Sequence, residues 1–161
     1  MKSNKEPVLS ELLTSALKMA QGVGCEVVRS QTNDLEGETK TMFAGQEVCF
    51  APRNDLRDLK MQALQVLILE GAFLVAENGA CWINGDAFGD NRALPFLAET
   101  LVVILNPTQI AGNMHEAYER IGSERFAYGL FMSGPSKTAD IEQSLVIGAQ
   151  GPRRLVLWLK E

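Results

Sequence analysis

The feature that most constrains the fold of this chain is a continuous apolar run, LVVIL, at residues 101–105. A strand in which every residue is apolar is typical of a sheet that is covered on both faces. Other strand-like segments alternate with helix-like ones at the spacing of βαβ units. The sequence therefore predicts an α/β fold with three layers, α/β/α, around a mostly parallel sheet with a local antiparallel hairpin.

The predicted elements follow one another along the whole chain. The first helix is marked by apolar residues at three- and four-residue steps from Leu9 to Ala20, and Gly22 and Gly24 end it. Further helices are predicted at 53–64, 93–100 and 113–121, and residues 31–46 are predicted to be a loop or a marginal helix. Strands are predicted at 25–30, 47–51, 65–69, 73–83, 101–105, 126–133 and 153–160.

Residues 73–83 carry the signal of the antiparallel hairpin. Two apolar runs are joined there by Glu77, Asn78 and Gly79. Asn-Gly is the strongest short-range hairpin signal because both residues tolerate a positive φ.

Composition favours one domain over residues 1–161, because 46% of the chain is hydrophobic and 22% is charged. A net charge of -5 and the absence of a Lys/Arg cluster disfavour nucleic acid as a partner. The longest apolar stretch, 64–83, is interrupted by polar residues, so no membrane span is expected. Because the first residues also lack the pattern of a signal peptide, the expected location is the cytoplasm.

No metal site or cofactor is expected from this chain alone. Cys25, Cys49 and Cys81 lie far apart in the sequence without a CxxC pair, and His115 is the one histidine. We expect each cysteine to be a small buried apolar residue.

Residues 133–152, SGPSKTADIEQSLVIGAQGP, are bracketed by two Gly-Pro pairs. A helix is predicted here, with Thr138 as its N-cap, Asp140 and Glu142 in its first turn and Gly148 as its C-cap. The alternative is an anion site, in which Gly134, Ser136, Lys137 and Thr138 supply backbone N–H groups, hydroxyls and an ammonium group. Ligands bind at the carboxyl ends of strands in open α/β sheets, which favours that alternative. The missing GxxxxGK[ST] spacing and the two acids count against it.

The run GPSKTADIEQSLVIGAQGP resembles the C-terminal signature of the LUD domain family of lactate utilisation protein C-like proteins. GAFLVAENGACWI resembles the Ala-Glu-Thr-Gly-Thr hairpin of that family, and LVVILNPTQI resembles its strand followed by Ser-Gln-Ile. The resemblance covers residues 64–160 and is weak over 1–63. Asn78 and Ala80 stand where the family usually has threonine, which puts a hydroxyl-dependent role at this hairpin in doubt.

The resemblance implies the fold shared by glucosamine-6-phosphate deaminases, ribose-5-phosphate isomerases and CoA transferases. It also implies a non-redox subunit of a system that oxidises L-lactate to pyruvate. Iron–sulfur clusters would then lie on partner subunits, with no cofactor in this chain. A small anionic metabolite is the implied ligand, and the resemblance leaves a homo-oligomer open.

Two other functions compete with the subunit hypothesis. Glu77-Asn78-Gly79 resembles the Glu-Asn-Gly at which class I CoA transferases form a glutamyl thioester, so Glu77 is the candidate catalytic nucleophile. Alternatively, Glu77 simply precedes a tight turn. In a small-molecule binding module, Arg92 would hold a carboxylate through a two-point contact, unless it is an exposed loop arginine.

These arguments predict one ligand cleft. Its expected members are Glu77 as the catalytic residue and, as ligand-binding residues, Asn78, Gly79, Arg92, Gly134, Ser136, Lys137, Thr138 and Asp140.

Overall fold

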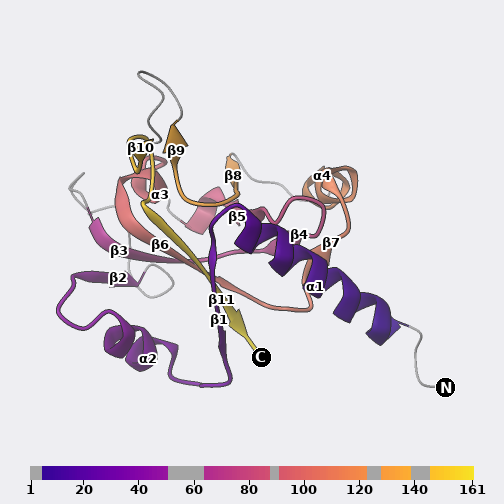
Figure 1. Ribbon diagram of the computed structural model, residues 1–161, viewed down its shortest axis with the longest axis horizontal. Coiled ribbons are helices and arrows are strands. Elements are labelled where there is room, and N and C mark those ends of the chain that lie inside the picture. The colour runs from indigo at the N-terminus through magenta and orange to yellow at the C-terminus, as the bar shows by residue number, and fades with distance from the viewer. Residues whose placement is uncertain (1–4, 51–63, 88–90, 123–127, 139–145) are drawn as a thin grey trace.

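The structure, a computed structural model, describes residues 5–50, 64–87, 91–122, 128–138 and 146–161 (Figure 1). Its helices are α1 (Lys5–Gly22), α2 (Leu35–Met42), the short α3 (Leu94–Leu97) and α4 (Met114–Gly122), with a 3-10 turn, η3, at Gly85–Ala87. Its strands are β1 (Glu26–Ser30), β2 (Val48–Phe50), β3 (Leu64–Glu70), β4 (Phe73–Val75), β5 (Cys81–Asn84), β6 (Ala98–Leu105), β7 (Ile110–Ala111), β8 (Gly129–Met132), β9 (Lys137–Thr138), β10 (Val146–Ile147) and β11 (Arg154–Lys160).

A five-stranded sheet in the order β1-β11-β6-β3-β2 forms the centre of the molecule. Every neighbouring pair in this sheet is parallel. Its middle strand, β6, is buried along its whole length except at Glu99, as the uninterrupted apolar run predicts. The predicted α/β class with a mostly parallel sheet is therefore confirmed.

Two apolar clusters cover the two faces of this sheet. On one face, Ala16, Leu17 and Ala20 of α1 pack against the side chains of Leu67, Leu101 and their odd-numbered neighbours. On the other face, Phe43 at the end of α2 packs against Val66, Ile68, Val102, Ile104, Val156 and Trp158. Helices therefore lie on both faces of the sheet, as the three-layer prediction requires.

A second, four-stranded sheet in the order β7-β4-β5-β8 packs on the α1 side of the central sheet. It contains the predicted hairpin, with β4 antiparallel to β5 and Phe73 paired with Trp82. Leu74, Cys81 and Ile83 face the central sheet, whereas Trp82 and Phe131 face Ala117 of α4. In Figure 1, α2 and α4 accordingly lie on opposite sides of the strands.

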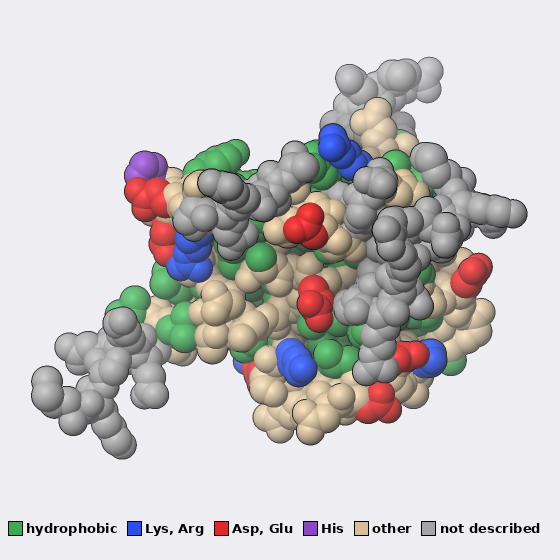
Figure 2. All heavy atoms as spheres, turned by 180° about the vertical axis from the view of Figure 1, so that it is seen from behind, with side chains coloured by type: hydrophobic (Ala, Val, Ile, Leu, Met, Phe, Trp, Pro, Cys, Tyr) green, Lys and Arg blue, Asp and Glu red, His purple; other side chains and the backbone are tan. Residues whose placement is uncertain are grey.

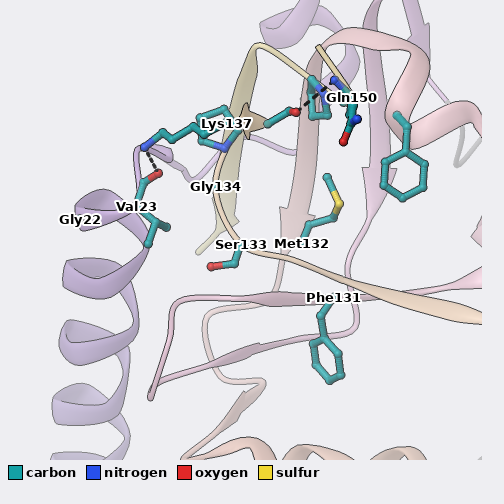
Figure 3. Close-up of a pocket in the computed structure, with 13 residues that line it drawn as sticks. Gly22, Val23, Phe131, Met132, Ser133, Gly134, Lys137 and Gln150 are labelled. Atoms are coloured by element: carbon teal, nitrogen blue, oxygen red, sulfur yellow. Dashed lines mark hydrogen bonds between the residues drawn. The ribbon is translucent and has the colours of Figure 1, made fainter. Parts of the chain in front are cut away.

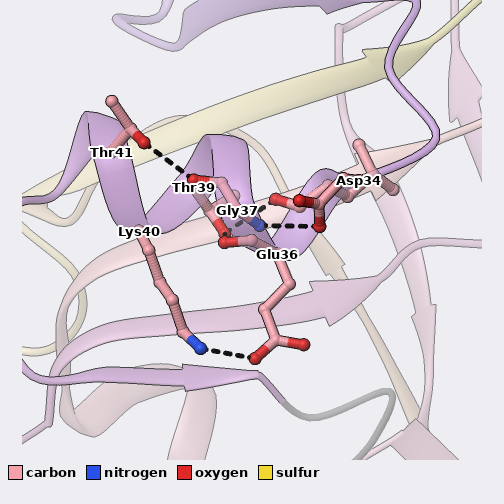
Figure 4. A network of polar contacts seen from close by, with 7 residues as sticks. Asp34, Glu36, Gly37, Thr39, Lys40 and Thr41 are labelled. Atoms are coloured by element: carbon pink, nitrogen blue, oxygen red, sulfur yellow. Dashed lines mark hydrogen bonds and ion pairs between the residues drawn. The ribbon is translucent and has the colours of Figure 1, made fainter.

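The short helix α2 forms where the sequence predicts a loop or a marginal helix, and local polar contacts explain why (Figure 4). The Asp34 carboxylate accepts a hydrogen bond of 3.0 Å from the Gly37 N–H, which caps the first turn. Lys40 pairs with Glu36 one turn earlier at 2.7 Å. Phe43 then buries its ring beneath the sheet.

The helix predicted between Thr138 and Gly148 is wrong at its two described ends, and residues 139–145 lie outside the described residues. Lys137–Thr138 and Val146–Ile147 are instead the antiparallel strands β9 and β10, with Thr138 opposite Val146. Gly148 has a φ of +84° directly after β10, so it belongs to a turn and not to a helix end. Asp140 and Glu142 lie outside the described residues, as does most of the helix predicted at 53–64.

Two features bear on the expectation that neither a membrane nor nucleic acid is a partner. Within the described ranges, no helix is both long enough and apolar enough to span a bilayer. On the face shown in Figure 2, Lys and Arg side chains lie apart from one another, with acidic side chains between them.

Candidate functional site

A cavity of about 630 Å³ opens beside the segment that follows β8 (Figure 3). Its wall is formed by residues 131–137, by residues 150–152 and by Gly22, Val23 and Phe96. The last two groups immediately precede the parallel strands β11, β1 and β6. The cavity therefore lies at the amino ends of the central strands, whereas the general rule for open sheets placed the ligand at their carboxyl ends.

Close backbone packing places residues 133–137 against the end of α1. A Cβ atom on Gly134 would lie 2.7 Å from the Val23 carbonyl oxygen, and Gly134 has a φ of +80°. Only glycine allows the chain to come so close in this conformation. The Ser136 N–H donates to the Pro152 carbonyl at 2.8 Å, which ties the same segment to the start of β11.

Three side chains with hydrogen-bond donors line the cavity, Ser136 and Lys137 from one segment and Gln150 from another. Figure 3 shows the Lys137 ammonium at the Val23 side of the cavity, away from Gln150. The Lys137 ammonium donates to the Val23 carbonyl at 2.7 Å and keeps two further N–H groups for a ligand. The Ser136 hydroxyl accepts from the Gln150 backbone N–H at 3.3 Å and can still donate its own proton. The exposed side-chain amide of Gln150 makes no hydrogen bond to another described residue. Met132 and Phe96 add apolar surface to this wall.

The hairpin turn that contains Asn78 and Gly79 lies next to this segment. The Ser133 hydroxyl donates to the Asn78 carbonyl oxygen at 3.2 Å. The Asn78 side chain accepts from the Ala80 N–H at 3.0 Å, so it closes its own turn. Gly79 packs directly on the α1 backbone at Ala20. These residues support the cavity wall but do not line the cavity.

Glu77 faces a different part of the molecule. Its carboxylate accepts a hydrogen bond of 2.8 Å from the Met114 N–H, the first residue of α4. An acceptor at this point satisfies one of the free N–H groups of the helix and complements the helix dipole. The structure thus gives Glu77 a capping contact, and Glu77 is not among the described residues that line the cavity.

The capping contact predicts how substitutions at Glu77 will behave. Glu77→Gln keeps an oxygen acceptor and should change the free energy of unfolding by less than about 0.5 kcal/mol, whereas Glu77→Ala should lower it by about 1 kcal/mol. Urea unfolding followed by circular dichroism measures both. If Glu77 were a nucleophile, incubation with an acyl-CoA and hydroxylamine would modify it in the natural chain and not in Glu77→Gln.

The remaining residues that were predicted to bind the ligand are Arg92, Thr138 and Asp140. The Arg92 guanidinium lies 4.9 Å from the ring centroid of Tyr128, just before β8. Ser133 lies at the other end of this extended strand, about 16 Å away. Arg92 is exposed and does not line the cavity. Thr138 lies in β9, and Asp140 is outside the described residues.

The buried thiols near the cavity are poor nucleophiles. Burial raises the pKa of the Cys25 thiol, although the Gly134 N–H and the Lys137 charge act in the opposite direction. Burial and the nearby Cys25 raise the pKa of Cys81 to about 12. Both thiols are therefore protonated at neutral pH and lack the thiolate that nucleophilic attack or metal binding requires.

Comparison with known protein families places this chain. The family model of the LUD domain matches residues 50–159, which is more than half of the chain. The chain belongs to the LUD domain family. A crystal structure of a DUF162 family protein from Deinococcus radiodurans has the same fold, with a TM-score of 0.62 and 14% identity over 95% of this chain and 98% of the other.

Curated relatives of this LUD domain share one name. The "Lactate utilization protein C" of Bacillus pumilus (strain SAFR-032) is 32% identical over 93 residues, which are 54% of this chain and 38% of the relative. The protein of the same name from Geobacillus kaustophilus (strain HTA426) is 37% identical over 70 residues, which are 39% of this chain and 29% of the relative. The chain thus matches well under half the length of either relative.

The LUD domain cavity includes residues that sequence reasoning missed. Gln150 and the end of α1 at Gly22 and Val23 were not predicted to belong to a site. The Gly-Pro pair that follows Gln150 was a usable signal, because it marks a turn next to a strand. No local signal links Val23 to Lys137, since these residues are 114 positions apart in the sequence.

Proposed function

We propose that this LUD domain serves lactate utilisation by binding a small carboxylate such as L-lactate in the cavity beside residues 133–137. The shared name of its curated relatives, "Lactate utilization protein C", supports a role in lactate utilisation. The observation that carries the ligand class is the polarity of the cavity wall. Among the described lining residues Lys137 is the one charged residue, and none is an acid, although the chain as a whole has a net charge of -5.

The donors suit a carboxylate with a short apolar end. Lys137 supplies a charge-assisted hydrogen bond, which is stronger than a neutral one. Ser136 and Gln150 approach from neighbouring turns and supply two neutral donors. Met132 and Phe96 offer apolar contact for a methyl group. A free phosphate would use the donors but gain nothing from the apolar side chains.

We also propose that the oxidation itself takes place on iron–sulfur partner subunits. Cys25 and Cys81 lie buried in one core cluster, and Cys49 on β2 is partly buried against the same cluster. Within the described ranges, no three His, Cys, Asp or Glu side chains are grouped so that they could hold a metal ion. An iron–sulfur absorption band in the purified chain would contradict this assignment.

Isothermal titration of the purified chain with L-lactate tests the ligand site. Gln150→Ala and Lys137→Gln should each weaken L-lactate binding about tenfold, because a hydrogen bond to a charged group contributes about 1.5 kcal/mol or more. Gln46→Ala is the matched control, since Gln46 is exposed and lies outside the cavity.

Inorganic phosphate and acetate serve as the comparison ligands. We expect L-lactate to bind more tightly than either, because acetate lacks the hydroxyl group and phosphate lacks the methyl group. Equal affinity of all three ligands, or L-lactate binding that Gln150→Ala and Lys137→Gln leave unchanged, would refute the proposed site.

A further inference from the structure

A second crevice lies at the opposite ends of the same parallel strands. It has a volume of about 240 Å³ and is lined by Glu70, Gly71, Ile104, Leu105, Asn106 and Lys160. These residues end β3, β6 and β11 or follow them directly. The crevice thus occupies the carboxyl edge of the three central strands, where ligands of open α/β sheets bind.

Strand register brings two opposite charges to one face of this edge. Glu70 on β3 pairs with Ile104 on β6, and Leu105 pairs with Leu159 on β11. Side chains alternate between the two faces of a strand. Glu70 therefore projects on the same face as Ile68, and Lys160 on the same face as Trp158. Ile68 and Trp158 both belong to the apolar cluster that packs against Phe43, so the two charges lie on the α2 face of the sheet.

The two charges flank β6 without neutralising each other. β3 and β11 are separated by one strand, so their axes lie about 10 Å apart. Neither the Glu70 carboxylate nor the Lys160 ammonium forms an ion pair with another described residue, and both side chains are exposed. Each charge is therefore available to a ligand in the crevice.

The floor between the charges is mainly apolar. Ile104 and Leu105 are buried to 6% and 1% exposure. The backbone of Gly71 borders the crevice, while its Cβ position lies against the side chains of Val103 and Leu105. At the far side, the Asn106 side-chain oxygen accepts hydrogen bonds from the Thr108 N–H and hydroxyl at 2.9 and 2.8 Å. These bonds fix the amide so that its NH₂ group is left to donate.

We propose that this crevice binds a linear amino acid whose ammonium and carboxylate groups stand at opposite ends of a short methylene chain. The ammonium would meet Glu70, the methylenes would lie over Ile104 and Gly71, and the carboxylate would meet Lys160. An α-amino acid carries both charges on one carbon and cannot reach both partners. A simple carboxylate would be repelled by Glu70, and a simple amine by Lys160, so the paired charges select for a ligand that has both.

Two-dimensional NMR of the full chain tests the crevice, with 4-aminobutyrate and 6-aminohexanoate as the probes. Glycine, butyrate and butylamine are the comparison ligands. We expect shifts of the amide signals of Gly71, Leu105 and Asn106, with at least one of the two probes binding more tightly than all three comparison ligands. Glu70→Gln and Lys160→Gln should each weaken binding of the probes by up to about fivefold, the range of an exposed ion pair.

One variant is expected to bind a comparison ligand more tightly, a result that misfolding cannot produce. Glu70→Gln removes the repulsion and should raise the affinity for butyrate, which a misfolded variant would not do. Glu99→Gln is the matched control, because Glu99 lies at the amino end of β6, next to Arg153. The proposal would be overturned if butyrate bound as tightly as both probes, or if Glu70→Gln changed none of these affinities. The lactate titration separates the two sites, because Glu70→Gln should leave L-lactate affinity unchanged.

Discussion

Replacing Gly79 by alanine is expected to lower the free energy of unfolding by about 3 kcal/mol, because strain and overpacking act together. Gly79 has a φ of +67°, which a residue with a Cβ atom adopts only with strain. Its position in the turn also leaves no room: a Cβ atom would lie 2.3 Å from the Ala20 nitrogen and 2.6 Å from the Ala20 Cα. These are backbone atoms of α1, so a side-chain rotation cannot relieve the contact. Urea unfolding followed by circular dichroism measures the loss.

Two other glycines separate the causes of this effect. Gly45 has a φ of +82° and no atom within 4 Å of its Cβ position, so Gly45→Ala should show the cost of the backbone conformation alone, about 1 kcal/mol. Gly122, at the end of α4, has neither feature, and Gly122→Ala should cause no loss. If Gly79→Ala and Gly45→Ala cost the same, the hairpin turn does not pack on α1 as described.

The contact between the turn and α1 also affects the proposed ligand site. The same turn receives the Ser133 hydroxyl, and Ser133 belongs to the cavity wall. A turn displaced by Gly79→Ala would move that wall away from Val23. We therefore expect weaker L-lactate binding by Gly79→Ala even at temperatures where the variant is still folded.

Replacing Leu101 by alanine is expected to cost about 3 kcal/mol, the usual loss when a fully buried leucine leaves a cavity. Leu101 is 0% exposed on the middle strand β6 and packs in the same cluster as α1 and the second sheet. Its neighbours on β3 and β11, Leu67 and Leu155, are equally buried. The surrounding sheet is therefore too rigid to close the space.

Met42→Ala is the control for this prediction, because Met42 at the end of α2 is 46% exposed and should change stability by less than about 0.5 kcal/mol. Thermal unfolding of both variants in the same buffer makes the comparison. Equal melting temperatures for Leu101→Ala and the natural chain would show that β6 is not the covered middle strand of the sheet.

The capping role of Glu77 illustrates what a local motif can and cannot specify. The turn at Glu77-Asn78-Gly79 follows from backbone preferences alone, so its prediction is confirmed. The partner of the Glu77 carboxylate is Met114, 37 residues further along the chain. Pairing of β4 with β7 brings that residue near the turn, and a two-residue strand such as β7 leaves no clear signal in a sequence.

The error at residues 137–138 and 146–147, the described ends of the helix predicted there, has a similar origin. Thr138, Asp140 and Glu142 are good residues for the first turn of a helix, and Gly148 is a good helix end. The described ends instead form the antiparallel pair β9 and β10, and backbone hydrogen bonds just outside this pair hold it in place. The Gly148 N–H donates to the Ser136 carbonyl at 2.9 Å, while the Ser136 N–H is held by Pro152 at 2.8 Å.

Hydrophobic period and turn chemistry are local properties, so the order of residues was enough to specify the fold class, the covered middle strand and the hairpin turn. The positions of the two proposed sites depend on the tertiary structure instead. The segment around Ser136 meets the amino ends of the parallel strands, and Glu70 and Lys160 flank β6 at their carboxyl ends. Both arrangements join residues that are distant in the chain, so strand order and register, and not neighbouring residues, specify them.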